Sequence, residues 1–260
     1  MTDADEAELL DVAIEAARAA AAELTERFGA RARGVQAKST PTDLVSDADL
    51  AAETAIRGVL GRRRPDDRIL GEEGGETGEG RLRWLVDPLD GTVNFLFGIP
   101  AFAVSVACED ASGALAGVVL DVMRGERFEA TRSGEALVNG ALIRGSERAD
   151  LATAMVATGF GYDAAVRERQ ADVVARVIPR VRDIRRIGAA ALDLAWCACG
   201  RFDAYYERGV KAWDVAAGAL ICERAGLEVR DLAGEGEVVP PGLVVAPAGI
   251  IEELVGLVSR

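Results

Sequence analysis

The chain has 260 residues, of which 50% are hydrophobic and 28% are charged, and its formal net charge is −13. This length can bury a sizeable core in one large domain or two small ones, and the composition is that of a soluble globular protein. The negative charge argues against nucleic acid or an anionic membrane as a main partner. No apolar run reaches membrane-spanning length, so no membrane partner is expected.

Histidine is absent from the sequence. Its absence excludes a Ser-His-Asp triad, a thiolate paired with histidine, a phosphohistidine route and any histidine-ligated metal. Acid–base and metal chemistry is therefore left mainly to carboxylates, hydroxyls, lysines and cysteines.

The four cysteines all lie in apolar runs, where we expect them to fill the core. They are Cys108, Cys197, Cys199 and Cys222. No pair has Cys-x-x-Cys spacing, which argues against a zinc or redox site. Because this usage suits a reducing cytosol and the acidic N-terminus lacks the basic region of a signal peptide, we expect a cytoplasmic protein.

Two helices are predicted near the N-terminus, each opening on a capping box and ending at a glycine. The capping pairs are Asp3 with Glu6 and Ser46 with Asp49, and the terminal glycines are Gly29 and Gly61. The apolar spacing of the second helix predicts a buried face of Ala52, Ile56, Val59 and Leu60. Between the helices, residues 38–45 form a turn-rich segment around Pro41.

The middle of the chain reads as short strands joined by turns. The candidate strands cover residues 69–70, 84–86, 103–108, 116–121, 126–130, 136–138 and 141–144. Asn139-Gly140 is typical of a tight hairpin turn, and the glycine- and glutamate-rich stretch 71–80 predicts a loop. This spacing predicts an antiparallel meander.

From about residue 151 strands and helices alternate. The expected strands are 154–158, 181–185, 202–207, 227–230 and 243–246, and the expected helices are 164–178, 189–199, 213–225 and 250–258. Alternation of this kind predicts a layered α/β half. We therefore expect an α+β domain over residues 1–148 and a smaller α/β domain over residues 149–260.

One stretch, residues 83–95, organises the chemistry of the chain. Its apolar run predicts a buried strand that ends at Asp87, and Pro88 is expected to bend the chain away from the ladder. Asp90 follows three residues later, so the two carboxylates can converge on one hard cation such as Mg²⁺. Gly91 lets the backbone approach a ligand closely, and a helix beginning near Thr92 would add an anion site.

Further oxygen ligands are expected at the ends of other elements, where each also has an ordinary structural explanation. Glu72 and Glu73 follow a short strand but also fit a solvated loop, and Asp214 opens a helix but also fits a cap. Asp49 is equally explained as the partner in a capping box. Lys38, Arg185 and Arg186 fit ordinary surface charges.

Together these motifs resemble the inositol monophosphatase family, in the wider group with fructose-1,6-bisphosphatase. The resemblance runs nearly end to end and rests on five segments: KSTPTDLVSDAD at 38–49, GEE at 71–73, DPLDGTVNF at 87–95, GAAALDLA at 188–195 and WDVAAG at 213–218. It implies a mixed αβ, layered αβαβα sandwich, with the N-terminal helix pair and the meander sheet followed by the smaller α/β half.

The resemblance also implies a set of metal ligands for two to three Mg²⁺ ions. Glu72, Asp87 and the carbonyl of Leu89 would hold one ion, and Asp87, Asp90 and Asp214 would hold a second. A third, looser ion would lean on Glu72. Cations placed in this way would offset the repulsion between the carboxylates and clamp both oxygens of an in-line displacement.

Catalytic and substrate-binding roles follow from the same resemblance. Thr92, hydrogen-bonded to Asp49, would help to orient and deprotonate a metal-bound water, and Glu72 is the third residue expected to be catalytic. The N–H groups of Gly91 and Thr92 would hold the phosphate. The remaining substrate contacts would come from Glu207, Asp214 and the backbone of Ala189 and Ala190.

The implied activity is Mg²⁺-dependent hydrolysis of a small phosphorylated polyol or sugar, with inositol-1-phosphate first among the candidates. Fructose-1,6-bisphosphate, histidinol phosphate and 3′-phosphoadenosine 5′-phosphate stay open as substrates, partly because Lys211 and the glycine-rich loop after Glu73 depart from the family pattern. The resemblance further implies a homodimer and inhibition by Li⁺. A regulatory binding protein that keeps the fold is a second possible function.

Other phosphatase classes fit the sequence less well. A haloacid-dehalogenase-type enzyme would need its nucleophilic aspartate at the position of Pro88, which removes the covalent route. No cysteine begins a Cys-x5-Arg loop, and no Gly-x4-Gly-Lys phosphate loop is present.

Overall fold

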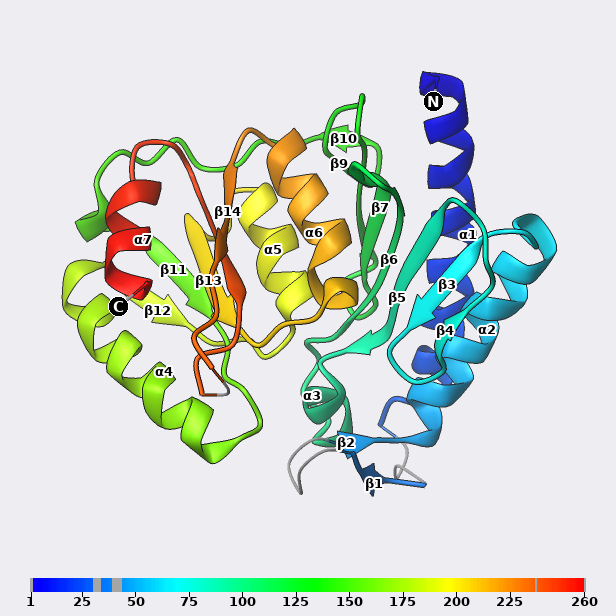
Figure 1. The fold of residues 1–260 in the computed structure, drawn as a ribbon, viewed down its shortest axis with the longest axis horizontal. Coiled ribbons are helices and arrows are strands. Elements are labelled where there is room, and N and C mark those ends of the chain that lie inside the picture. The colour runs from blue at the N-terminus through cyan, green and yellow to red at the C-terminus, as the bar shows by residue number, and fades with distance from the viewer. Residues whose placement is uncertain (1, 30–33, 39–43, 237, 260) are drawn as a thin grey trace.

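Five layers of secondary structure are stacked face to face in the computed structural model, which describes residues 2–29, 34–38, 44–236 and 238–259. A helix pair covers one face of a large sheet, a second pair fills the space between that sheet and a smaller one, and a third pair covers the outer face of the smaller sheet (Figure 1). This is the αβαβα sandwich that the family resemblance implies.

The first helix pair consists of α1 (Asp3–Arg27) and α2 (Asp47–Arg63). The capping box of α2 is the predicted one: the N–H and hydroxyl of Ser46 both donate to Asp49. The prediction for α1 was wrong, because Thr2 and Asp5 form its capping box. Glu6 instead accepts hydrogen bonds from the N–H and the hydroxyl of Ser133.

The predicted helix ends are only partly correct. The helix α1 ends before Gly29, as expected, but α2 continues through Gly61 to Arg63. The residues around Pro41 lie outside the described part of the chain. The flanking residues form a two-stranded sheet of β1 (Gln36–Ala37) and β2 (Leu44–Val45).

The large sheet has eight strands in the order β10-β9-β8-β7-β6-β5-β3-β4. They are β3 (Arg68–Gly71), β4 (Gly75–Thr77), β5 (Arg83–Asp90), β6 (Ala103–Asp110), β7 (Gly113–Asp121), β8 (Glu126–Thr131), β9 (Leu137–Val138) and β10 (Ala141–Leu142). The meander from β5 to β10 is antiparallel, as predicted, whereas β3 pairs with β5 in parallel. The predicted loop 71–80 contains the edge strand β4.

The smaller sheet has five strands in the order β12-β11-β13-β15-β14. They are β11 (Met155–Thr158), β12 (Asp183–Arg185), β13 (Ala204–Arg208), β14 (Glu228–Leu232) and β15 (Gly242–Ala246). The strands β11, β12 and β13 run parallel, and β15 is antiparallel to its neighbours.

The middle layer is formed by α5 (Ala190–Ala198) and α6 (Ala212–Arg224), and the outer layer by α4 (Ala164–Val177) and α7 (Ile251–Val258). Every residue of α5 is buried, because both sheets press on this layer. One continuous hydrophobic core runs from the large sheet through α5 and α6 to the smaller sheet. Of the cysteines, only Cys199 is partly exposed. No described helix has the length and apolar character needed to cross a bilayer.

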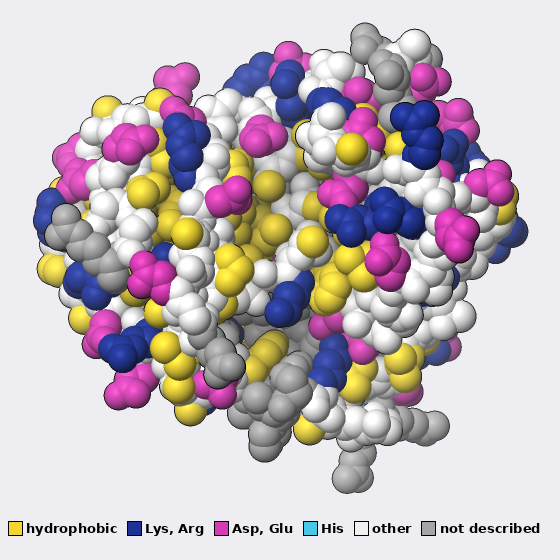
Figure 2. Space-filling model, in the orientation of Figure 1, with side chains coloured by type: hydrophobic (Ala, Val, Ile, Leu, Met, Phe, Trp, Pro, Cys, Tyr) yellow, Lys and Arg dark blue, Asp and Glu magenta, His cyan; other side chains and the backbone are white. Residues whose placement is uncertain are grey.

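Charged side chains are scattered over the outside of this sandwich, among hydrophobic and uncharged ones. Basic and acidic groups are interspersed over the face shown in Figure 2, and many of them pair along or between elements. On this face the acidic side chains therefore do not form one block.

Close packing of α6 on the large sheet makes Gly117 of β7 a sensitive position. A Cβ atom there would lie 2.8 Å from the Cα of Ala217, which is backbone and cannot yield easily. We expect Gly117→Ala to lower the free energy of unfolding by about 2 kcal/mol. Gly256→Ala is the matched control, because Gly256 lies in α7 with nothing within 4 Å of the added atom. That control should gain about 0.5–1 kcal/mol, and equal effects in urea unfolding would contradict the packing argument.

Candidate active site

The stretch that the sequence singles out forms a bulged strand end. Pro88 lies inside β5, so the prediction that it bends the chain out of the ladder was wrong. The pairing with β6 instead shifts register between Asp87 and Asp90, so both carboxylates can face the same side. Gly91 follows in a left-handed conformation (φ 94°), and the short helix α3 (Thr92–Leu96) begins directly after it.

The middle helix layer and the smaller sheet supply the other wall. Asp214 lies in the first turn of α6, and Ser105 of β6 donates to the carbonyl of Trp213 at 3.0 Å, which ties that turn to the large sheet. Glu207 comes from β13, and Ala189 precedes α5.

These segments enclose an open cavity of about 330 Å³. Its lining contains ten of the eleven predicted site residues, namely Glu72, Asp87, Leu89, Asp90, Gly91, Thr92, Ala189, Ala190, Glu207 and Asp214. Asp49 lies behind this lining, in contact with Thr92. The structure therefore brings together residues that are up to 165 positions apart in the sequence.

Each acidic side chain of the cavity is directed at a donor of the protein itself. Asp90 accepts from the N–H groups of Ala190 (3.2 Å) and Ala191 (2.7 Å), so the N–H of Ala190 faces Asp90 in this structure. The other carboxylates accept as follows: Asp87 from Leu89 N at 3.0 Å, Asp214 from Lys211 N at 2.7 Å and Glu72 from Lys38 Nζ at 2.8 Å. Within the described residues, no three acidic or thiol side chains lie close enough to form a ready-made metal cage.

The carboxyl groups of this cavity hold their protons unusually tightly. Burial raises the pKa of Asp90 to about 7 and that of Asp214 to about 8. Burial also raises the pKa of Asp87 well above its ordinary value, and the charges of Glu72, Asp90 and Asp214 add to the shift. The cavity thus concentrates more negative charge than the protein neutralises.

Lys38 offers partial compensation at one end of the cavity. Its ammonium group donates to Glu72 at 2.8 Å and to Glu73 at 2.5 Å. Burial lowers the pKa of Lys38, but the two carboxylates outweigh that effect and raise it overall. Glu73 has a pKa raised to about 7, because its burial outweighs the pairing. Lys38 was expected to be an ordinary surface charge and instead faces the acidic cluster.

Thr92 and Asp49 form a buried pair beneath the cavity. The Thr92 hydroxyl lies 3.0 Å from Asp49 Oδ1 and 3.1 Å from the carbonyl oxygen of Leu89. Asp49 also accepts from the N–H and hydroxyl of Ser46. Burial raises the pKa of Asp49 even though these donors oppose the shift. Asp49 therefore serves the capping box and Thr92 at the same time, through different oxygens.

Glu207 lies on the opposite wall with its carboxylate held by the protein. Tyr205 donates to it at 2.8 Å, and burial raises its pKa to about 7. The neighbouring loop passes close by, since a Cβ atom at Gly159 would lie 2.0 Å from a Glu207 carboxylate oxygen.

Two residues near the cavity were not recognised from the sequence. Asp193 of α5 is fully buried with neither oxygen hydrogen-bonded, and burial raises its pKa well above normal. A single aspartate within the apolar run AALDLAW was the signal that could have identified it. Phe160 belongs to the loop that lines the cavity, and its ring contacts the guanidinium of Arg186. Arg186 was expected to be a surface charge, but it also lines the cavity.

Comparison with known proteins agrees with this arrangement. The sequence model of the inositol monophosphatase family matches residues 5–259. The inositol-1-monophosphatase of Mycobacterium bovis is 43% identical over 96% of this chain and 91% of that protein. The Nus factor SuhB of Pseudomonas aeruginosa is 40% identical over 92% of this chain and 90% of that protein.

Solved structures give the same result. The extragenic suppressor protein SuhB of Bartonella henselae has a TM-score of 0.89 at 35% identity, over 97% of this chain and 98% of that one. The Thermotoga maritima IMPase has a TM-score of 0.86 at 31% identity, over 96% of each chain. Agreement in sequence and fold along almost its whole length shows that the chain belongs to the inositol monophosphatase family.

Proposed function

We propose that the protein hydrolyses a small phosphomonoester, first of all inositol-1-phosphate, with two to three Mg²⁺ ions. The observation that carries this proposal is the convergence of Glu72, Asp87, Asp90 and Asp214 on one cavity, where three of them have raised pKa values. Family membership supports the phosphatase activity, while the substrate and the metal are our inference.

The donor set fits Mg²⁺. This ion takes carboxylate and carbonyl oxygens and is bound by few protein ligands plus substrate phosphate. The cavity lining contains Leu89 and the four carboxylates that are the expected ligands, namely Glu72, Asp87, Asp90 and Asp214. Bound cations would offset the burial and the mutual repulsion that raise these pKa values, neutralise the phosphate and make an attacking water more acidic. The pairing of Lys38 with Glu72 shows that the cluster already attracts a positive group.

The chain's own residues would bind the phosphate, orient the attacking water and accept its proton. The first N–H groups of α3 have no acceptor within the helix, so those of Gly91 and Thr92 are available to a phosphate oxygen. The hydroxyl of Thr92 can pass its proton to Asp49 while it accepts one from a water in the cavity. Because Asp49 has a raised pKa, it is suited to hold that proton.

Substrate selection is proposed to depend on Glu207. Its carboxylate is fixed by Tyr205 and lines the wall opposite Thr92, so it can accept hydrogen bonds from hydroxyls of a polyol or sugar. A cavity of about 330 Å³ has room for one phosphorylated ring. The name of the Mycobacterium bovis relative supports inositol-1-phosphate ahead of the alternatives.

Phosphate release is the direct test. Inositol-1-phosphate, fructose-1,6-bisphosphate, histidinol phosphate and 3′-phosphoadenosine 5′-phosphate would each be tested with Mg²⁺, with Mg²⁺ plus Li⁺, and with EDTA. We expect release only with Mg²⁺, fastest from inositol-1-phosphate and reduced by Li⁺. Release that persists in EDTA would contradict the metal dependence, and a different fastest substrate would contradict the proposed specificity.

Burial of the carboxylates, together with the charges of their neighbours, also predicts a pH dependence of stability without metal. Folding raises the pKa of Asp90 from 3.8 to about 7 and that of Asp214 from 3.8 to about 8, so the native state keeps protons that the unfolded state has already lost. Stability should therefore fall as the pH rises from about 4 to about 8 and level off once the folded groups ionise. Mg²⁺ should flatten this fall. Thermal unfolding in EDTA and in Mg²⁺ checks it, and a fall of the same size in both would contradict charge compensation by Mg²⁺.

A binding role is the second candidate function, and the relatives named Nus factor SuhB favour keeping it. The two functions are separable, because a binding role does not need the cavity carboxylates.

We also propose a cytoplasmic homodimer, which size-exclusion chromatography with light scattering would test. A monomer at micromolar concentration would contradict the dimer.

A further inference from the structure

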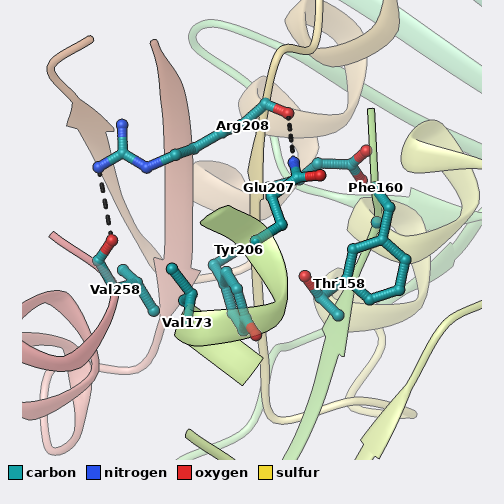
Figure 3. Close-up of a pocket in the computed structure, with 9 residues that line it drawn as sticks. Thr158, Phe160, Val173, Tyr206, Glu207, Arg208 and Val258 are labelled. Atoms are coloured by element: carbon teal, nitrogen blue, oxygen red, sulfur yellow. Dashed lines mark hydrogen bonds between the residues drawn. The ribbon is translucent and has the colours of Figure 1, made fainter. Parts of the chain in front are cut away.

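A second cavity, of about 390 Å³, lies beside α4 and is separate from the candidate active site. Its walls come from α4, the segment between β14 and β15, and the end of α7. Arg208, the last residue of β13, is part of its lining. Arg208 also borders the active-site cavity and a narrow space between the two, which Figure 3 shows.

The guanidinium of Arg208 is buried without a partner of opposite charge. The residue is 9% exposed and donates to the carbonyls of Ala233 (2.8 Å), Pro240 (3.0 Å) and Val258 (3.4 Å), the last drawn in Figure 3. In the described part of the chain it forms no ion pair, although the charge of Glu235 acts on it from further away. A guanidinium has five N–H donors, so two are left for a ligand.

A buried charge of this kind is unfavourable unless something compensates it. Guanidinium groups stay protonated in proteins, so Arg208 cannot relieve the penalty by losing its proton. Neutral carbonyls satisfy hydrogen bonds but do not cancel the charge. An anion that enters the cavity would supply the missing partner.

The rest of the lining indicates what kind of anion fits. Among the residues that the structure describes, the charged side chains of the lining are three arginines and two carboxylates, so this part of the lining is positive on balance: Arg169, Arg176, Arg208, Asp172 and Glu235. Valines and a proline make up most of the remaining wall. We propose that this cavity binds a small organic carboxylate with an apolar body, and that its carboxylate pairs with Arg208.

A ligand on Arg208 would be coupled to the active site through two connections. Glu207, the proposed substrate ligand, is its neighbour in β13. Gln170 of α4 is 7% exposed; it accepts from the N–H of Gly161 at 2.9 Å and donates to the carbonyl of Arg208 at 3.2 Å. Because Gly161 lines the active-site cavity, fixing Arg208 should also restrain that wall.

Butyrate is a suitable probe, with neutral butyramide as its control at constant ionic strength. At ten times its Kd, butyrate should raise the Tm of the wild-type protein by about 3 °C, and butyramide should not. Arg208→Met removes the charge but keeps the length of the side chain. Because three carbonyls lose this donor, it should lower the Tm of the unliganded protein, and it should lose the butyrate shift. Arg186→Met, which removes an arginine of the active-site cavity, should keep the shift.

Two results would contradict the proposed binding site. One is no shift in the Tm of the wild type with butyrate at up to 100-fold excess over protein and 50 mM, and the other is an unchanged shift in Arg208→Met. If Arg208→Met does not fold, Val173→Phe decides, because it fills the cavity from α4 and should abolish the shift with Arg208 intact. Binding also predicts at least a twofold change in the KM of the phosphatase reaction. A shift in Tm without a change in KM would overturn the coupling and leave the site.

Discussion

Replacing Asp90 with asparagine should lower turnover of the preferred phosphomonoester by about 10³-fold while the protein stays folded. Asp90 is the residue through which the bulge of β5 meets the start of α5, since it accepts from Ala190 and Ala191. Asparagine keeps one acceptor oxygen for these N–H groups but removes the negative charge from the centre of the acidic cluster. Charge that stabilises the reacting group is lost, whereas the scaffold loses about one hydrogen bond.

The stability of Asp90→Asn separates this explanation from simple misfolding. Asp90 carries a pKa of about 7 because it is buried, so its charge is unfavourable to the metal-free fold at pH 8. Removing it should therefore leave the Tm in EDTA at pH 8 unchanged or higher, and the rise in Tm caused by Mg²⁺ should become smaller. Glu147→Gln, which removes a charge from an exposed loop, is the matched control. Full activity of Asp90→Asn would contradict the proposed site.

Local patterns in the sequence predict most of the elements but not their ends. Ser46 and Asp49 identify the start of α2 because a capping box is a short-range device. Gly61 did not end that helix, because an interior glycine costs only about 1 kcal/mol and tertiary packing can outweigh it. Pro88 stays inside β5 for a similar reason: a bulge removes the need for its missing N–H, so the ladder continues past it.

The residues of the candidate site could be predicted where they belong to a family motif. They could not be predicted where a contact between segments far apart in the sequence determines their position. The lining of the cavity agrees with the motif. Lys38 meets Glu72 only because β1 and the end of β3 come together in space, and no pattern in the sequence connects them. Asp193 and Arg208 are buried charged residues, and periodicity cannot show whether such a residue faces solvent, a partner or a cavity.

Replacing Thr92 with valine should lower turnover by about 10²-fold, because it removes the hydroxyl that links the cavity to Asp49. Valine keeps the shape of the side chain, so the phosphate-facing backbone of Gly91 and Thr92 is preserved. Asp49 keeps both hydrogen bonds from Ser46 but loses its third donor while buried. We expect the free energy of unfolding to fall by about 1–3 kcal/mol, as is usual for an unsatisfied buried acceptor.

Serine at position 92 distinguishes a proton relay from a packing role. Thr92→Ser restores the hydroxyl but not the methyl group, so activity should return to within about tenfold of the wild type although some stability is still lost. If Thr92 and Asp49 act as one unit, the double variant Thr92→Val with Asp49→Asn should be little slower than either single variant. Multiplied losses in the double variant would mean that the two residues act independently, and the 3.0 Å contact between them would then be structural alone.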